Sequence, residues 1–261
     1  MSDYTTISVV REGAVDWLTL NRPERLNALN ATMVRELWSY FDGLQSDFSR
    51  RVVVMRGAGK GFCAGLDLIW FNEAGATMPG GATDTGPGPS LGDIVLKMRS
   101  CPQAIVALVH GAACGGGFIF ALAADIRIAG RSARMNVTFV KLGLSGCELG
   151  TSYFLPRMLG TSVAAELMMT GRFIHADRAL AAGLVSEVVD DEHLEVAGRA
   201  VVEDLLAASP IGLRKTKEVM ACAAGIEDLA AVIALEEHTQ MACMRASAFG
   251  QTVAGFAGSK S

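Results

Sequence analysis

The chain has 261 residues, of which 51% are hydrophobic and 19% are charged, and its formal net charge is −4. This length and composition predict a globular protein with one large core and exclude a disordered chain. The acidic balance, without a long basic run, excludes nucleic acid as a main partner. No segment is long and apolar enough to cross a bilayer, so no membrane partner is expected either.

The cysteines, histidines and N-terminal residues predict a cytoplasmic protein that binds no metal. The six cysteines form no Cys-x-x-Cys pair and are expected to be reduced, and the four histidines show no metal-ligand spacing. The first residues, MSDYTTISVVREG, lack the basic and apolar stretches of a signal peptide.

The first part of the chain predicts a hairpin followed by a helix. Ile7–Val10 and Val15–Leu20 alternate in the manner of strands, and a short turn separates them. A polar turn follows, and Asn30 is a suitable N-cap for an amphipathic helix over Ala31–Ser46.

The middle of the chain predicts strands and helices in alternation, which is typical of an α/β fold with parallel strands joined by helical crossovers. The predicted strands are Arg51–Arg56, Ala104–Val109, Ile126–Ala129 and Leu184–Val189. The predicted helices are Leu91–Arg99, a segment that ends at Ala123, Thr161–Thr170 and Ala176–Gly183. Between the first strand and the first helix, Ala74–Ser90 is rich in Gly, Pro and Thr and predicts a mobile loop.

The C-terminal part of the chain is purely helical in its pattern, with predicted helices at Leu194–Ala208, Ile211–Ala223 and Ile226–Arg245. We therefore predict a core domain over residues 1–205 and a helical region over residues 206–261, which is a candidate for docking a partner.

Two glycine-rich segments each follow a buried strand and precede a helix. They are FCAGLDL at residues 62–68 and HGAACGGGF at residues 110–118. The first N–H groups of a helix have no partner within the helix, and glycine lets a ligand oxygen come close to the backbone. Two such turns side by side form an oxyanion hole, whereas either turn alone is more often a site of tight packing.

These segments, together with LNRPERLNALN at residues 20–30, resemble the crotonase (enoyl-CoA hydratase/isomerase) superfamily. The motifs LGL (142–144), LPRMLG (155–160), LMMTGR (167–172) and AGLVSEVV (182–189) add to the resemblance, which covers about residues 5–210. It implies an α/β fold with a ββα spiral core and C-terminal helices that form trimers, often paired into hexamers. The implied partner is an acyl-CoA substrate, and coenzyme A enters as part of that substrate, without another tightly bound cofactor.

The resemblance also implies roles for particular residues. The two oxyanion N–H donors correspond to Leu66 and Gly116. The residues implied to line the path of coenzyme A are Arg25, Leu26, Ala28, Ala64, Asp67 and Leu68. Phe256 and Lys260 lie in the region where members of the family contact CoA across a subunit boundary.

The chain departs from the family's hydratases at two catalytic positions. Hydratases of the family hold water between two glutamates, and the corresponding residues here are Ile119 and Phe139. Hydration needs one group to activate water and one to deliver a proton, and neither side chain can do either.

Glu148 is the remaining candidate for proton transfer. It corresponds to an aspartate that moves protons in enzymes resembling dienoyl-CoA isomerase, and that acts as a nucleophile in relatives resembling 4-chlorobenzoyl-CoA dehalogenase. The dehalogenase route lacks an aligned histidine here. A helix start near Glu148 favours the ionised carboxylate, whereas the apolar Ile119 and Phe139 favour the protonated form, and the sequence leaves both open. A purely structural role at a helix terminus is also open.

The sequence therefore predicts an acyl-CoA enzyme that stabilises a thioester enolate and moves a proton with Glu148, as an isomerase does. The alternatives are an enoyl-CoA hydratase with a non-standard acid/base set, a CoA-binding protein without catalysis, and a trimeric scaffold without a ligand.

Overall fold

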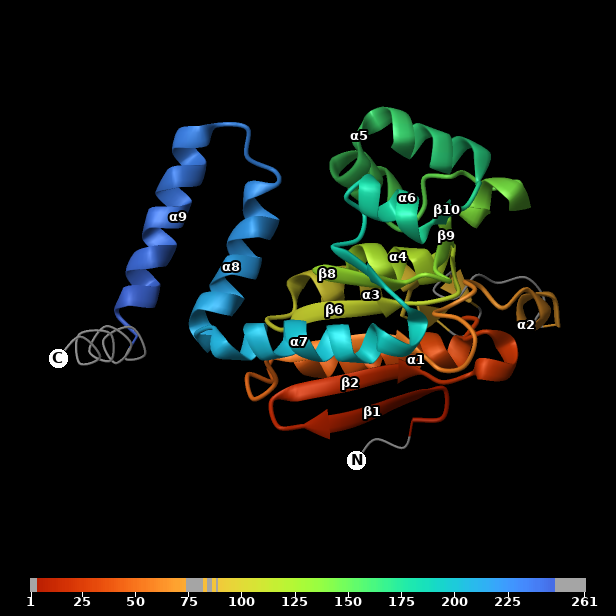
Figure 1. The fold of residues 1–261 in the computed structure, drawn as a ribbon, viewed down its shortest axis with the longest axis horizontal. Coiled ribbons are helices and arrows are strands. Elements are labelled where there is room, and N and C mark those ends of the chain that lie inside the picture. The colour runs from red at the N-terminus through yellow and green to blue at the C-terminus, as the bar shows by residue number, and fades with distance from the viewer. Residues whose placement is uncertain (1–3, 74–81, 84–85, 88, 247–261) are drawn as a thin grey trace. The chain divides into compact units, whose positions relative to one another are not determined.

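A computed structural model describes residues 4–73, 82–83, 86–87 and 89–246 (Figure 1). Most of the predicted mobile loop at 74–90, and both Phe256 and Lys260, lie outside these residues. The chain divides into two compact units, Met1–Val201 and Val202–Ser261. This division and the one predicted after residue 205 both fall within α7 (Leu194–Ala207).

The first unit is built on a six-stranded sheet with the order β1-β2-β3-β6-β8-β11. Its strands are β1 (Ile7–Glu12), β2 (Val15–Leu20), β3 (Val52–Gly57), β6 (Ala104–Val109), β8 (Ile126–Gly130) and β11 (Glu187–Val189). The strands β1 and β2 form an antiparallel hairpin, and every other pair in the sheet is parallel. The predicted hairpin and parallel crossovers are therefore confirmed.

A three-stranded sheet was not predicted. It contains β7 (Ala112–Cys114), β9 (Arg134–Asn136) and β10 (Ile174–His175), with β9 in the centre. These strands have two or three residues each, which is too short for a periodic pattern to show. As a result, the sequence pattern assigns the residues of β7 to the glycine loop. Another short antiparallel pair is β4 (Ala82–Thr83) with β5 (Gly86–Pro87).

The helices of the first unit follow the predicted pattern closely. They are α1 (Ala31–Leu44), α2 (Leu68–Glu73), α3 (Leu91–Ser100), α4 (Gly116–Ala123), α5 (Thr151–Thr170), α6 (Ala176–Ala181) and the start of α7. The Asn30 side chain accepts a hydrogen bond from the Met33 N–H at 2.9 Å, so the predicted N-cap is confirmed. Helix α5 contains Pro156, and the non-helical dihedral angles of Gly160 (φ 74°, ψ 164°) divide it into two segments. The second segment is the predicted helix Thr161–Thr170, and the first begins where the sequence predicts a helix start near Glu148.

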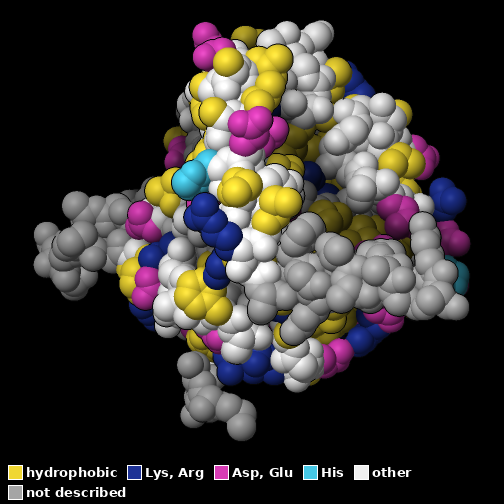
Figure 2. Space-filling view, turned by 90° about the vertical axis from the view of Figure 1, so that its left-hand side faces the viewer, with side chains coloured by type: hydrophobic (Ala, Val, Ile, Leu, Met, Phe, Trp, Pro, Cys, Tyr) yellow, Lys and Arg dark blue, Asp and Glu magenta, His cyan; other side chains and the backbone are white. Residues whose placement is uncertain are grey.

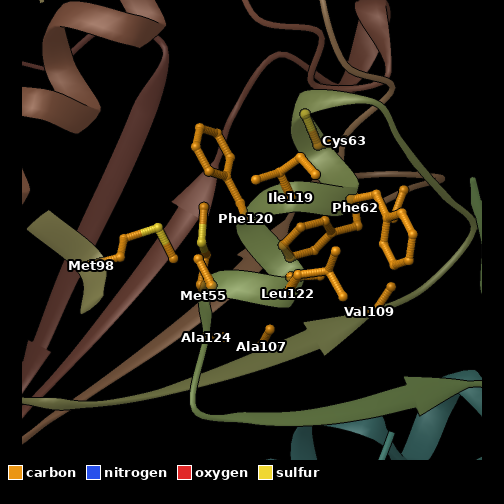
Figure 3. Close-up of a cluster of buried hydrophobic side chains, with 14 of the residues drawn as sticks. Met55, Phe62, Cys63, Met98, Ala107, Val109, Ile119, Phe120, Leu122 and Ala124 are labelled. Atoms are coloured by element: carbon orange, nitrogen blue, oxygen red, sulfur yellow. The ribbon is translucent and has the colours of Figure 1, made fainter. Parts of the chain in front are cut away.

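Helix α4 lies in the centre of the core on one face of the large sheet (Figure 3). All of its residues are buried, which its continuous apolar sequence explains. Figure 3 shows Ile119 and Phe120 of α4 in the same cluster as Met55 of β3 and Met98 of α3. The helix start is thereby fixed against the sheet.

The N-terminal half of α7 covers the other face of the sheet. A Cβ atom at Gly198 would lie 2.9 Å from the side chain of Leu108, so this glycine lets the helix pack closely on β6. The guanidinium of Arg199 lies over the ring of Trp17, 4.4 Å from its centroid. The sheet is therefore covered on both faces, as expected for parallel strands.

The second unit contains α8 (Pro210–Ala223) and α9 (Leu229–Met244), which contact each other. Hydrophobic side chains on both helices are exposed, among them Met220 at 67% and Leu229 at 71%. Figure 2 shows one face of the molecule, on which hydrophobic side chains lie among charged ones. None of the described helices has both the length and the apolar character needed to span a membrane.

The packing of α4 generates a stability prediction. A methyl group at Gly117 would lie 2.6 Å from the Cβ atom of Cys63, whereas one at Gly43 in α1 would meet nothing within 4 Å. We expect Gly117→Ala to lower the free energy of unfolding by about 1–3 kcal/mol or more through overpacking. The control Gly43→Ala is expected to raise it by about 0.5–1 kcal/mol, because alanine favours a helix. Urea unfolding measures both, and equal effects would contradict this description of the packing.

Candidate active site

The two glycine-rich loops lie side by side at the ends of the neighbouring strands β3 and β6. Backbone hydrogen bonds join them: the N–H of Phe62 donates to the His110 oxygen at 2.8 Å, and that of Cys63 to the Ala112 oxygen at 2.9 Å. The Cys114 N–H donates back to the Cys63 oxygen at 2.9 Å. The loops predicted to share one site are therefore held in one fixed arrangement.

Glycine is required where these loops touch. Gly65 has φ 88°, and a Cβ atom on it would lie 2.7 Å from the carbonyl oxygen of Cys114. Any other residue would be strained at this dihedral angle and would also push the two loops apart. The close approach brings Leu66 and Gly116, the residues that follow these contacts, to the same cavity.

The N–H of Leu66 has no partner among the described residues. The carbonyl oxygen of Gly65 accepts from the Leu29 N–H at 2.7 Å, and the Asp67 N–H donates to the Leu29 oxygen at 3.0 Å. These two hydrogen bonds use the groups on either side of the Leu66 amide, and no other described residue pairs with the amide itself. The sequence-based expectation required such an unpaired donor.

The N–H of Gly116 is equally without an acceptor in the part of the chain that the structure describes. Gly116 is the first residue of α4, and the first N–H groups of a helix have no intrahelical partner. The preceding Gly115 donates to the Asn136 oxygen at 3.1 Å, which fixes the entry into the helix. The partial positive charge of the helix start adds to the donor strength of Gly116.

Both residues line a cavity of about 410 Å³, a volume within the range of small-ligand sites. The cavity lies between the glycine loops, the start of α3, the 3₁₀ helix η2 (Thr138–Leu142) and the turn before α5. The described residues that line it are Ala64, Gly65, Leu66, Leu68, Ser90, Leu91, Gly92, Gly115, Gly116, Thr138, Phe139, Leu142, Leu144, Glu148 and Leu149.

Glu148 lies in the turn that leads into α5, where the sequence predicted a helix start. Its N–H donates to the side-chain oxygen of Thr151 at 2.9 Å, and its carbonyl oxygen accepts from the Thr151 N–H at 3.0 Å. These bonds fix the backbone of Glu148, and Thr151 is itself fully buried. The carboxylate forms no hydrogen bond or ion pair with any described residue, so it is available to a ligand in the cavity.

Ile119 and Phe139 stand where hydratases of the family carry glutamates. Both side chains are apolar, and they pack in different places. Ile119 lies within α4, is completely buried and belongs to the hydrophobic core cluster (Figure 3). Phe139 lines the cavity, and its ring lies 3.5 Å from the place where a Cβ atom of Gly115 would stand. Glu148 is consequently the only acidic side chain among the described residues that line the cavity.

The residues assigned to the path of coenzyme A come from two segments that lie side by side. The N–H of Ala64 donates to the carbonyl oxygen of Leu26 at 2.9 Å, so the turn after β2 lies directly beside the first glycine loop. Arg25 ends the 3₁₀ helix η1 (Pro23–Arg25), Ala28 follows it, and Leu68 is half exposed at the start of α2. Their contacts with CoA stay a prediction.

Asp67 has a partner within the chain. Its carboxylate pairs with Arg22 at 2.9 Å and accepts from the Trp70 N–H at 3.1 Å. Burial alone would raise the pKa of this carboxyl, but the Trp70 N–H and the Arg22 guanidinium outweigh it, so the pKa lies below its usual value. Asp67 therefore braces the first loop, and its predicted contact with CoA stays a prediction.

Asn27 supports the site and was missed from the sequence. It is fully buried with φ 57°, and its side-chain amide donates to the carbonyl oxygens of Ala58 and Gly61, both at 2.8 Å. The amide ties the turn after β2 to the first glycine loop. The available signal was an asparagine in a polar turn, since asparagine tolerates the left-handed region better than most residues.

Known proteins are similar to this chain over nearly all of its length. The family model described as enoyl-CoA hydratase/isomerase matches residues 11–260. A probable enoyl-CoA hydratase of Mycobacterium bovis is 39% identical over 209 residues, which cover 78% of this chain and 72% of that protein. The 1,2-epoxyphenylacetyl-CoA isomerase of Escherichia coli K12 is 33% identical over 98% of this chain and 96% of its own length.

The fold is similar to solved structures as well. The crystal structure of an enoyl-CoA hydratase from Bacillus anthracis superposes with a TM-score of 0.89 at 28% identity, covering 98% of this chain and 97% of that one. The predicted crotonase-like α/β fold is confirmed by this likeness.

The Asp67–Arg22 pair generates a pH-dependent prediction. Asp67→Asn is expected to lower the free energy of unfolding at neutral pH by about 1–3 kcal/mol, because the partly buried Arg22 loses its charged partner. Since the folded pKa of Asp67 is lowered, the stabilisation is complete above the ordinary carboxyl pKa of about 3.9 and is lost as the pH falls through the folded value. The difference between wild type and variant, measured by urea unfolding, should therefore shrink in acid. Asp204→Asn, on an exposed residue, is the control, and a pH-independent difference for Asp67→Asn would contradict the assignment.

Proposed function

The chain belongs to the enoyl-CoA hydratase/isomerase family, and on that basis we propose that it is an isomerase-type acyl-CoA enzyme that moves a proton with Glu148. The observation that carries this proposal is the single carboxylate among the described residues of the cavity, with Phe139 and Ile119 at the positions of the hydratase glutamates. One carboxylate is enough to take a proton from one carbon and return it to another.

In the proposed reaction, the thioester oxygen of the substrate accepts hydrogen bonds from the N–H groups of Leu66 and Gly116. Neither donor has a partner in the described chain, so both are available without breaking an internal bond. Donors fixed in advance stabilise an oxyanion strongly, and loss of one such donor typically costs about 10²–10³ in rate. This arrangement supports an enolate as the intermediate.

The proton balance for a 3-enoyl-CoA is as follows. The Glu148 carboxylate removes a proton from C2, and the electron pair of that C–H bond moves toward the thioester carbonyl to give a dienolate. The protonated Glu148 then delivers the proton to C4, and the double bond moves from C3=C4 to C2=C3. Every atom of the substrate is retained, and the carboxylate is regenerated.

Coenzyme A would lie along Arg25, Leu26, Ala28, Ala64 and Leu68, because Ala64 and Leu68 line the cavity beside Leu66 and Ala64 bonds to Leu26. We include coenzyme A as part of the substrate and no other tightly bound cofactor. We further propose a homotrimer or homohexamer. The exposed apolar side chains of α8 and α9 support an assembly role for the second unit.

Enoyl-CoA hydration is the second candidate, favoured by the 39% identity to a probable enoyl-CoA hydratase. In that case Glu148 would have to activate water and deliver the proton without a second carboxylate. Phe139 stands where hydratases of the family carry a glutamate, so a water beside Glu148 would meet no second carboxylate among the described lining residues.

The central prediction concerns Glu148→Gln. We expect this variant to lower kcat for the conversion of trans-3-hexenoyl-CoA to trans-2-hexenoyl-CoA by about 10²–10⁴, since it removes the group that carries the proton. The affinity for the acyl-CoA should change little, because glutamine has the same size. The ultraviolet absorbance of the conjugated thioester measures turnover, and calorimetry measures binding.

The matched control is Glu187→Gln, which changes an exposed glutamate on β11 outside the cavity and should leave kcat unchanged. Isomerisation that survives in Glu148→Gln would refute the proposed mechanism. Hydration of trans-2-hexenoyl-CoA faster than isomerisation by the wild type would favour the second candidate.

A further inference from the structure

The position of the Glu148 carboxylate depends on the backbone that carries it. Its side chain has no hydrogen-bond or ion-pair partner among the described residues, so no neighbouring polar group holds it in the cavity. The turn at residues 146–150, which we call the Glu148 turn, contains two consecutive residues in the left-handed region, Leu149 (φ 52°) and Gly150 (φ 92°). A leucine is unfavourable there, and such a conformation persists only where the surrounding structure holds it.

The first residue of α5 holds one side of this turn. The hydroxyl oxygen of Thr151 accepts a hydrogen bond from the Glu148 N–H at 2.9 Å. The same hydroxyl donates toward the carbonyl oxygens of Glu148 and Gly146, which lie at 2.6 and 3.0 Å. Its side chain is completely buried, so water does not compete for these bonds. One threonine thus ties two points of the Glu148 turn to the start of α5.

The last turn of α5 contacts the Glu148 turn as well. A Cβ atom on Gly146 would collide with the carbonyl oxygen of Met168, so only a glycine lets the two backbones lie in contact here. The end of the helix is itself fixed, because the Asn136 side chain donates to the Gly171 carbonyl oxygen at 3.0 Å. The Glu148 turn therefore lies between the two ends of one helix.

A straight α5 could not make both contacts. Thr151 and Met168 would lie about 25 Å apart along a regular helix. In the structure the Thr151 hydroxyl reaches Gly146, and Gly146 in turn contacts Met168, so the two helix ends are much closer than that. Gly160, with non-helical dihedral angles, lies between them in the chain. The kink at Gly160 is therefore what brings both ends of α5 to the Glu148 turn.

Gly160 is required for its backbone conformation and not for lack of space. A Cβ atom on it would meet nothing within 4 Å. Its dihedral angles (φ 74°, ψ 164°), however, fall in a region that is essentially restricted to glycine. Any other residue would shift these angles and thereby move the segment of α5 that carries Met168 relative to the one that carries Thr151.

We propose that α5 positions Glu148 for proton transfer, with Gly160 and Thr151 as positioning residues. Thr151 acts through the backbone of Glu148, and Gly160 acts from outside the described cavity lining by bringing the two helix ends together. The inference rests on the proposed function, since it takes Glu148 as the group that carries the proton. The reacting atoms must lie about 3–3.5 Å apart, so a small shift of the carboxylate lowers the rate without weakening the binding of the thioester.

The first test is Gly160→Ala in the full-length protein. We expect this variant to lower kcat for trans-3-hexenoyl-CoA by about 10–10²-fold, since a misplacement of about 1 Å can cost that much. Calorimetry with hexanoyl-CoA, a saturated thioester that cannot be isomerised, should show little change in Kd. This split between kcat and Kd is expected of a positioning residue and not of a general loss of structure.

The matched control for this variant is Gly13→Ala, in the turn between β1 and β2. Gly13 also has a positive φ (58°) and open space around its Cβ position, but it lies outside the cavity lining. The substitution should lower the urea midpoint, because alanine is strained at this dihedral angle. It should leave kcat unchanged.

Thr151→Val and Thr151→Ser test the same arrangement without changing Gly160. Valine has the shape of threonine but no hydroxyl, so it should lower kcat by about tenfold or more, whereas serine should restore most of it. The control is Thr170→Val near the other end of α5, whose hydroxyl accepts from the Arg172 N–H at 3.2 Å and donates to the Glu166 oxygen at 2.6 Å. This control loses the same kinds of bond outside the cavity lining, and its kcat should not change.

The outcomes separate the inference from the function on which it rests. Wild-type kcat in a folded Gly160→Ala, or equal kcat in Thr151→Val and Thr151→Ser, overturns the inference. A fall in kcat with an equal loss of hexanoyl-CoA affinity also overturns it, because the whole site is then disturbed. If Gly160→Ala does not fold, the two Thr151 variants decide alone. Isomerisation that survives in Glu148→Gln removes the proposed function itself, and that measurement does not depend on these variants.

Discussion

The structure depends on the close contact between two glycine loops at the ends of neighbouring parallel strands. Hydrogen bonds between the backbones of Cys63, Ala112 and Cys114 fix the loops, and the glycines at 65 and 117 let them approach to distances at which a Cβ atom would collide. The bonding pattern satisfies the amides around the contact, and no described residue accepts a hydrogen bond from the amides of Leu66 and Gly116. An unpaired donor beside a cavity is costly unless a ligand or water meets it, and we take this cost as a sign of function.

We propose proton transfer by one carboxylate because the described lining of the cavity offers no second acidic or basic side chain. Ile119 serves the core, and Phe139 packs beside Gly115, so neither position offers an acid or a base. The acidic group of the described cavity is Glu148, whose backbone is fixed by Thr151 and whose carboxylate has no hydrogen-bond or ion-pair partner among the described residues. A site with two fixed donors and one carboxylate suits an enolate and a mobile proton better than the addition of water.

Much of this arrangement could be predicted from the sequence, because its signals are local. The strand Ala104–Val109, the N-cap at Asn30 and the glycine loops each depend on a few adjacent residues. What the sequence could not show depends on contacts between distant segments. Strands of two or three residues, such as β10, have no periodicity, and Pro156 and the kink at Gly160 obscure the extent of α5, because both residue types are typical helix breakers. The buried Asn27 and the Arg22–Asp67 pair were missed for the same reason, since their partners lie far along the chain.

The most direct test of the account is a crystal structure of the protein with a saturated acyl-CoA, read at the thioester oxygen. We expect this oxygen within about 2.7–3.1 Å of the backbone nitrogen atoms of both Leu66 and Gly116, the geometry of an oxyanion hole. A thioester oxygen that contacts neither nitrogen, with the acyl chain outside the cavity beside Glu148, would contradict the central claim.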